Sequence, residues 1–314
     1  MKKIHFIETI VCVLMLSCVS AQKTASYYAA AEALPYVKNS RDTQLKQTDI
    51  VPLILSHFEN SERRPKALVI NYDGCRIDLL PFLDAETSAV FSNASGGGFY
   101  LMFTGGEDGC LQNTRTAPGF TTQFTGKWAL EEGGHGVFNN GLLKKDEPRT
   151  HFVRLAEKGY VTAFHFLWGA YRSIFANDRR YAEKNGLPVE WNRCRPKGEA
   201  RKNPDEALMR EVIDRLSVEG EGEVDFLTCI FENTDLAGHH FGFSPDEERY
   251  REALLEIDGY ARKIIETVRN RSTYASEDWL ILISTDHGGR NLTHGAQSVY
   301  ERTIWISSNR PLQR

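Results

Sequence analysis

The chain has 314 residues, of which 41% are hydrophobic, and a formal net charge of −4 at pH 7. This length is sufficient for a well-buried core in one large domain or two small ones. The slight negative charge excludes a general positive field that would attract nucleic acid, so an anionic substrate must be held by local charges, bound metal ions among them.

The first 21 residues have the pattern of a secretory signal peptide. Two lysines near the start are followed by an apolar stretch from Ile10 to Val19 and by small residues before Gln22. We expect cleavage after Ala21 and export to the periplasm or the medium, with lipid attachment at Cys18 as the alternative. No segment approaches the ~20 apolar residues that a spanning helix needs, so we expect no transmembrane segment in the mature chain.

After a predicted N-terminal extension at residues 22–62, apolar strand patterns alternate with helical patterns. This alternation predicts an α/β fold with a mostly parallel central sheet and helices on both faces. Residues 63–314 are assigned to one domain, and residues 169–203, rich in Arg, Asn and Pro, to an insertion outside the sheet. Strands are predicted at 66–74, 100–106, 161–168, 225–235, 279–284 and 303–307, and helices at 77–92, 149–158, 204–216 and 245–269.

Four cysteines follow the predicted leader, namely Cys75, Cys110, Cys194 and Cys229. Export makes disulfides possible, but four scattered cysteines are no disulfide scaffold, and their spacing matches no thiolate zinc site. Cys75 and Cys110 flank segments near the predicted site and could pair there.

Acidic and histidine side chains follow three of the predicted strands. In open α/β sheets, functional groups collect beyond the carboxyl ends of the strands, so these side chains are expected at one edge of the sheet. Carboxylates and neutral imidazoles are ligands that Zn²⁺ accepts, and about three ligands per catalytic zinc would let six residues hold two metals. The six candidate ligands are Asp73, Asp235, His239, Asp286, His287 and His294.

Each of these residues has a structural alternative. An aspartate can cap the following helix, and a histidine can lie satisfied in the core or exposed in a loop. Independent caps would have no reason to bring three histidines to one sheet edge, which favours the metal site. The nearby glycines fit a crowded site in which the backbone approaches closely or takes positive φ; they are Gly74, Gly238, Gly288, Gly289 and Gly295.

Thr116 precedes an Ala-Pro-Gly sequence at which a helix is predicted to begin, at about Pro118. The free N–H groups and positive dipole end of this helix would face an anion. A metal-ionised hydroxyl at Thr116 could attack phosphorus, whereas a simple N-cap threonine is the alternative. Asn140 could donate a hydrogen bond to a phosphoryl oxygen, or could lie in a turn beside Asn139.

Four motifs occur in the order YDGCRID, TRTAPGFTTQFTG with the later HGVFNN, TDLAGHHFG, and STDHGGRNLTHG. In this combination the chain resembles the alkaline phosphatase superfamily, and within it the nucleotide pyrophosphatase/phosphodiesterase group, from about Lys66 to Ser307. The resemblance implies an alkaline-phosphatase-like catalytic domain that hydrolyses small phosphoesters, such as nucleotides or other phosphodiesters, with two divalent metal ions, expected to be Zn²⁺.

Carried over by position, the resemblance implies two sets of ligands. One zinc would be held by Asp235, His239 and His294, and the other by Asp73, Asp286 and His287, with the Thr116 oxygen as a further ligand of this second zinc. Thr116 would be the nucleophile of a phosphothreonine intermediate. Asn140, with the N–H of Ala117, would bind a non-bridging phosphoryl oxygen.

The chain departs from the group in two ways, one of which is that His294 follows His287 far more closely than in the long animal enzymes. The interval between Thr125-Gly126 and His135-Gly136 is a few residues longer than in its best-known members, which leaves Asn139 as an alternative to Asn140. The group's usual threonine nucleophile favours diesters, but a phosphomonoesterase with the same site is also possible, as is a non-catalytic binding protein on this fold. A monoesterase would need extra cationic contacts, for which Arg172, Arg193 and Arg195 are candidates.

Overall fold

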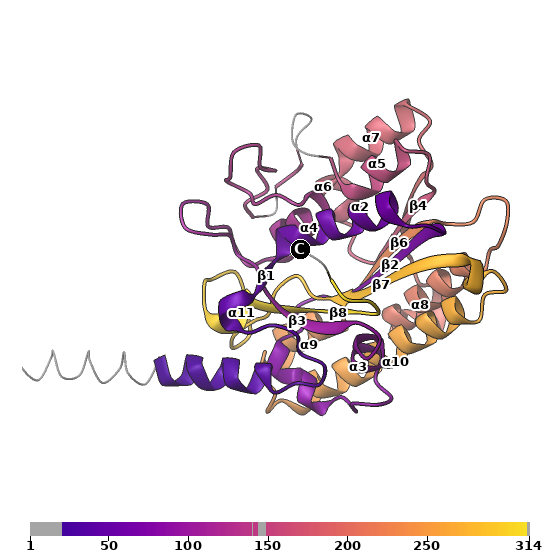
Figure 1. The fold of residues 1–314 in the computed structure, drawn as a ribbon. Coiled ribbons are helices and arrows are strands. Elements are labelled where there is room, and N and C mark those ends of the chain that lie inside the picture. Colours follow the sequence, from indigo (N-terminus) through magenta and orange to yellow (C-terminus); the bar gives the residue numbers. More distant parts are fainter. Residues whose placement is uncertain (1–20, 140, 144–148, 313–314) are drawn as a thin grey trace, which may run out of the picture.

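The computed structural model describes residues 21–139, 141–143 and 149–312, which form an α/β fold around one sheet (Figure 1). The sheet has eight strands in the order β1-β3-β8-β7-β2-β6-β4-β5. Neighbouring strands are parallel except β8, which runs antiparallel to β3 and β7. The predicted mostly parallel sheet is confirmed.

The strands are β1 (Leu45–Lys46), β2 (Arg64–Tyr72), β3 (Gly98–Phe103), β4 (Thr162–Phe166), β5 (Val189–Arg193), β6 (Phe226–Phe231), β7 (Glu277–Ser284) and β8 (Thr303–Ser308). The main helices are α2 (Ile50–Asn60), α3 (Ala89–Ala94), α4 (Thr116–Thr125), α5 (His151–Ala156), α6 (Tyr171–Ile174), α7 (Ala176–Lys184), α8 (Pro204–Leu216), α9 (Asn233–Phe241), α10 (Glu248–Arg269) and α11 (Val299–Arg302).

Helices cover both faces of the sheet, as Figure 1 shows. Alternate residues of a strand point to opposite faces. On β2, Leu68 and Ile70 pack with α3, α8 and α10, whereas Val69 on the other face packs with α2, α4 and α5. Because both faces are buried, the strands read as continuous apolar runs in the sequence.

The N-terminal extension contributes to the fold rather than only packing on it. Residues 21–32 are helical, and Tyr27 and Ala31 are buried in the core. Further on, β1 pairs with β3 and α2 packs against the sheet. Apart from Ala21, the predicted signal peptide with Cys18 lies outside the described residues, so export stays a prediction.

The prediction that residues 169–203 lie outside the sheet is wrong for one part of the segment. β5 pairs in parallel with β4 and forms the edge of the sheet. Its side chains are half-buried to exposed, which allows the polar sequence VEWNR on an edge strand. The remainder of the segment includes α6 and α7.

Three predicted helices differ in their bounds, and the one predicted at 149–158 is the shorter α5 (His151–Ala156). The predicted helix at 77–92 is a 3₁₀ turn, η3 (Ile77–Phe82), followed by the short α3; Pro81, which lacks an N–H, lies inside η3. The helix predicted from Pro245 begins at Glu248, because the Ser244 hydroxyl accepts from the Asp246 N–H and closes a turn before it. The helix at 204–216 is found as predicted in α8.

All four described cysteines are free thiols, so Cys75 and Cys110 do not form a disulfide. In the described part of the chain, no helix combines the length and the hydropathy that crossing a bilayer requires.

Candidate metal centre

The candidate ligands lie at the carboxyl ends of three neighbouring strands. β2 is flanked by β7 and β6. Asp73 follows β2, Asp235 lies in the first turn of α9 after β6, and Asp286 follows β7. The parallel pairing of these strands brings segments more than 150 residues apart in the chain to one edge.

The deeper half of the cluster consists of Asp73, Asp286 and His287, all buried. The His287 Nε2 atom lies 3.3 Å from Asp286 Oδ2 and 3.6 Å from Asp73 Oδ1. One ligand atom from each of the three residues lies within 4.8 Å of the others, a spacing at which a single cation can be shared.

The outer half opens toward solvent. The His294 Nε2 atom lies 3.5 Å from Asp235 Oδ1, and His239 Nε2 lies 3.4 Å from Asp235 Oδ2. The two Nε2 atoms of His239 and His294 are 3.0 Å apart. His287 also comes within 4.8 Å of Asp235 and His294, so its imidazole reaches both halves, whereas the resemblance implies a role in one alone.

The three histidines turn the same ring atom toward the cluster. Each Nδ1 lies 2.8–3.0 Å from a backbone carbonyl: His239 to Leu292 O, His287 to Gly288 O and His294 to Thr114 O. Since a carbonyl accepts only, Nδ1 carries the proton and the neutral ring leaves a lone pair on Nε2. This arrangement orients histidine ligands in metal sites.

Two carboxylate oxygens in the cluster have no donor among the described residues. Asp235 Oδ1 and Asp286 Oδ2 are buried and have no hydrogen-bond partner among the described residues. Burial, and then the charges of Asp286 and Asp235, raise the pKa of Asp73 well above its usual range. Burial likewise raises the pKa of Asp235 to about 6. A group of buried acceptors facing one another without donors fits cations as the missing partners.

Burial acts in the opposite direction on two of the histidines. It lowers the pKa of His287 well below the usual value, helped by the charge of His294, and it lowers the pKa of His294 to about 4, helped by His239. Neutral imidazoles are the form that binds a metal.

Thr116 is the first residue of α4 rather than its N-cap, which is Arg115. The Thr116 Oγ1 atom lies 3.3 Å from His287 Nε2 and 3.5 Å from Asp73 Oδ1. The first backbone N–H groups of a helix have no acceptor inside it, so Ala117, the second residue of α4, presents a free N–H beside the hydroxyl. The helix thus directs its positive end toward the cluster.

Asn140 lies outside the described residues, and its neighbour Asn139 is exposed. The segment before them is anchored by buried His135, whose Nε2 bonds to Thr122 Oγ1 of α4 at 3.0 Å and whose Nδ1 accepts from the Val137 N–H. Burial lowers the pKa of His135 to about 3, so the ring stays neutral.

A buried carboxylate from a different helix caps α9. Asp205 of α8 accepts from the Glu232 N–H at 3.1 Å and the Asn233 N–H at 2.8 Å, while the N-cap side chain of α9 makes no capping bond. Because α9 carries Asp235 and His239, Asp205 fixes the position of two candidate ligands.

A second buried carboxylate caps the start of a different helix, away from the cluster. Asp258 of α10 is buried and accepts from the N–H groups of Ala89 and Val90 at 2.8 and 3.1 Å, at the start of α3. Since α3 carries no candidate site residue, Asp258 is a natural control for Asp205.

Gly74 permits the close approach of β2 and α9. Its φ is +65°, and a Cβ built on it would lie 2.6 Å from Asp235 Oδ1. Its N–H donates to Asp286 Oδ1 at 3.2 Å. Any larger residue would displace a candidate ligand, which is the close approach expected from the glycines.

A cavity of about 300 Å³ opens beside the cluster and Thr116. Five lining residues were not predicted as site residues from the sequence: Arg115, Trp168, Glu232, Leu236 and Thr293. Arg115 directly precedes Thr116 in the sequence, so it could have been predicted to lie near the site. Burial, and then the charge of Asp205, raises the pKa of Glu232 to about 8.

The arginines suggested by the sequence do not line this cavity. Arg172 and Arg195 are exposed, and Arg193 donates from Nε to Leu167 O at 3.2 Å.

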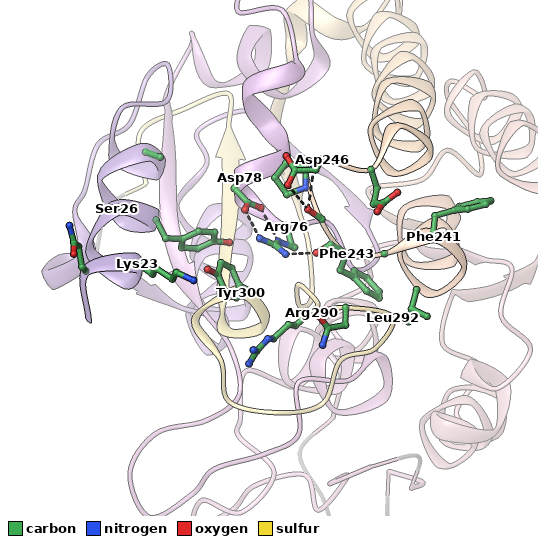
Figure 2. Close-up of a pocket in the computed structure, with 18 residues that line it drawn as sticks. Lys23, Ser26, Arg76, Asp78, Phe241, Phe243, Asp246, Arg290, Leu292 and Tyr300 are labelled. Carbon is green, nitrogen blue, oxygen red and sulfur yellow. Dashed lines mark hydrogen bonds and ion pairs between the residues drawn. The ribbon is translucent and has the colours of Figure 1, made fainter. Parts of the chain in front are cut away.

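A larger cavity, of about 1160 Å³, lies on the other side of the loop at 290–292 (Figure 2). Arg76 lies in it between Asp78 and the backbone of Phe243, to both of which it donates. The Phe243 ring separates this cavity from the cluster, with its centroid 5.3 Å from that of His239 and 6.0 Å from that of His294. No candidate ligand lines the larger cavity, which is therefore separate from the candidate metal centre.

The family model described as type I phosphodiesterase / nucleotide pyrophosphatase matches residues 67–306. The chain belongs to this family. The resemblance to the phosphodiesterase group of the alkaline phosphatase superfamily is therefore confirmed, and the matched range agrees with the extent from Lys66 to Ser307 expected from the motifs. A comparison with curated proteins finds no match.

Solved structures with this fold include human ectonucleotide pyrophosphatase / phosphodiesterase 5, with a TM-score of 0.50 and 16% identity over 71% of this chain and 57% of that chain. Phosphonoacetate hydrolase from Sinorhizobium meliloti, in complex with phosphonoformate, has a TM-score of 0.50 and 15% identity over 72% of this chain and 57% of that chain. Phosphonate monoester hydrolase of Agrobacterium radiobacter has a TM-score of 0.51 and 13% identity over 79% and 68%.

At these identities the similarity shows that this family member has the alkaline-phosphatase-like fold. The chain spans 57% of the length of the human and Sinorhizobium meliloti proteins.

Proposed function

We propose that the chain is an exported phosphoester hydrolase of the phosphodiesterase/nucleotide pyrophosphatase type, with a threonine nucleophile and two zinc ions. The observation that carries the proposal is a cluster of six acceptor side chains, in two adjoining halves, beside the Thr116 hydroxyl, which lies 3.3 Å from His287 Nε2. Membership of the family supports the choice of a phosphoester as substrate.

The residues present fit two cations. Asp73, Asp286 and His287 would hold one, and Asp235, His239 and His294 the other. Bound cations would supply Lewis-acid stabilisation of the negative charge on the attacking and leaving oxygens. The buried oxygens of Asp235 and Asp286 support this assignment, because no donor among the described residues satisfies them.

The chain's own residues would position and bond the substrate. Thr116 would attack phosphorus and form a phosphate ester on its hydroxyl oxygen, while the leaving group departs as an alcohol or nucleotide. Water would then hydrolyse this ester and restore the hydroxyl. The Ala117 N–H, and the Asn140 amide from outside the described residues, would donate to a non-bridging phosphoryl oxygen.

Replacing Thr116 by Ala tests the proposal. We expect turnover of bis(p-nitrophenyl) phosphate to fall by about 1000-fold or more, as for loss of a nucleophile, with the zinc content unchanged. Thr116→Ser should keep measurable turnover. Thr121→Ala is a control on the same helix, because its hydroxyl bonds to Ala117 O and does not face the cavity. Undiminished turnover by Thr116→Ala would refute the nucleophile.

A phosphomonoesterase is the second candidate, favoured by Arg115 in the cavity wall. A monoester carries a second negative charge that an extra cation would offset. Measuring kcat/KM for p-nitrophenyl phosphate beside the diester decides between them. A chain that binds zinc but turns over neither substrate would instead be a binding protein on this fold.

A further inference from the structure

We propose that Arg115 is a substrate-binding residue that bonds the non-bridging oxygens of the phosphoryl group. This inference rests on the proposed function and deepens it, since it assigns the cationic contact that the motifs leave unassigned.

Arg115 occupies the right place for this contact. It is the N-cap residue of α4, adjacent to Thr116, and its side chain lines the same cavity of about 300 Å³. The guanidinium reaches the loop that carries His294, because a Cβ built on Gly295 would lie 2.9 Å from Arg115 Nε and 3.6 Å from Arg115 Cζ. The Arg115 guanidinium therefore lies between the Thr116 position and the loop that carries His294, in the outer half of the metal centre.

The charge of Arg115 has no partner in the described part of the chain. Its Nε is buried without a hydrogen-bond acceptor. The carboxylates around the cavity face other groups: Asp235 faces His239 and His294, Asp73 and Asp286 face His287, and Glu232 accepts from the Trp168 N–H. Leaving a partly buried donor of a charged group unpaired is costly, so an acceptor from outside the chain is indicated.

A phosphoryl group is the acceptor that fits. The guanidinium fork matches phosphate oxygens and forms two parallel charge-assisted bonds. With two cations in the metal centre, Arg115 would add a further positive charge on the side where no described carboxylate balances it. An anion in the cavity would balance this charge, and a neutral ligand would not.

The direct test is the binding of inorganic phosphate to the zinc-loaded protein, measured by calorimetry. Arg115→Met should weaken phosphate binding about 10- to 100-fold, as expected for loss of charge-assisted bonds. Arg115→Lys keeps the charge without the fork and should lose less. The zinc content and the Tm, measured for each variant, show that the centre and the fold are retained.

Arg290 provides the matched control. Arg290 carries the same charge as Arg115 and lies on the loop that carries His294, but it lines the larger cavity of Figure 2 rather than the cavity beside Thr116. Arg290→Met should bind phosphate as the parent does. If Arg115→Met binds phosphate as tightly as the parent, or if both methionine variants lose equally, the assignment is wrong. A parent protein that loads zinc but neither binds phosphate nor hydrolyses a phosphoester would overturn the proposed function, and this inference with it.

Discussion

Replacing Asp205 by Asn should weaken cation binding although Asp205 touches no candidate ligand. The carboxylate accepts from the Glu232 and Asn233 N–H groups and so caps α9 from outside. The amide side chain of Asn keeps the size but has one acceptor oxygen instead of two and no charge. We expect the start of α9 to loosen, and Asp235 and His239 to lose their fixed position.

The size of the effect follows from the bonds removed. Loss of an N-terminal cap costs about 0.5–2 kcal/mol. If this cost falls on the conformation that holds the cation, affinity drops by roughly tenfold, since 1.4 kcal/mol corresponds to a factor of ten. Substitution of residues that orient metal ligands changes affinity by roughly 10- to 100-fold, which agrees with this value.

The Asp258→Asn variant distinguishes an effect on the position of the candidate ligands from a general loss of stability. Asp258 is also a buried carboxylate that accepts from two N–H groups at a helix start, those of Ala89 and Val90, and it accepts from the Tyr72 hydroxyl as well. Both variants should therefore lower the Tm by a few degrees, at roughly 2–4 °C per kcal/mol. Zinc affinity, measured by competition with a chromogenic chelator, should fall in Asp205→Asn alone. Equal zinc affinities in the two variants would refute the reasoning.

Three other predictions follow from the same geometry. Burial raises the pKa of Asp235 to about 6 and raises the pKa values of Asp73 and Asp286 further, so protons compete with cations for these carboxylates. The zinc affinity, measured by calorimetry, should therefore fall as the pH drops from 7.5 through 6, and an affinity that does not change with pH would contradict this. Gly74→Ala should lower both zinc content and Tm, because its φ is +65° and the new Cβ would lie 2.6 Å from Asp235 Oδ1; normal zinc loading would count against the crowded site. Lys66→Met removes a buried ammonium that lies 3.2 Å from Asp225 at the opposite end of β2. Because Arg64 still pairs with Asp225, chemical denaturation should show a loss of about 1.5–3 kcal/mol, with the zinc loading of the folded protein unchanged; a loss of zinc would contradict the independence of that end of the sheet from the centre.

The sheet was predictable because its signals are local. Buried parallel strands such as β2 and β7 are continuous apolar runs, and the sheet places the residues that follow them at one edge. β1 and β5 were missed because a two-residue strand and a half-buried edge strand carry no such run. The helix predicted at 77–92 is shorter in the structure because Pro81, which lacks an N–H, interrupts the helical hydrogen bonding.

The candidate ligands were predictable for the same reason, since each follows a strand or lies on the adjoining helix or loop. Asp205 was not, because the N–H groups that donate to it are 27 and 28 residues further along the chain and only the packing of α8 brings them together. The position of His287 between both halves of the centre also depends on side-chain packing. Arg115 could have been predicted from the sequence, since it directly precedes Thr116.

The number of zinc ions bound per chain tests the central claim most directly. The purified protein, stripped with a chelator, reloaded and freed of excess metal, should contain two zinc ions per chain by mass spectrometry. The variant that replaces Asp286 by Asn and His287 by Gln should lose the deeper ion and weaken the outer one, because His287 reaches both halves. A parent protein that retains no zinc, or a double variant that retains as much as the parent, would contradict the account.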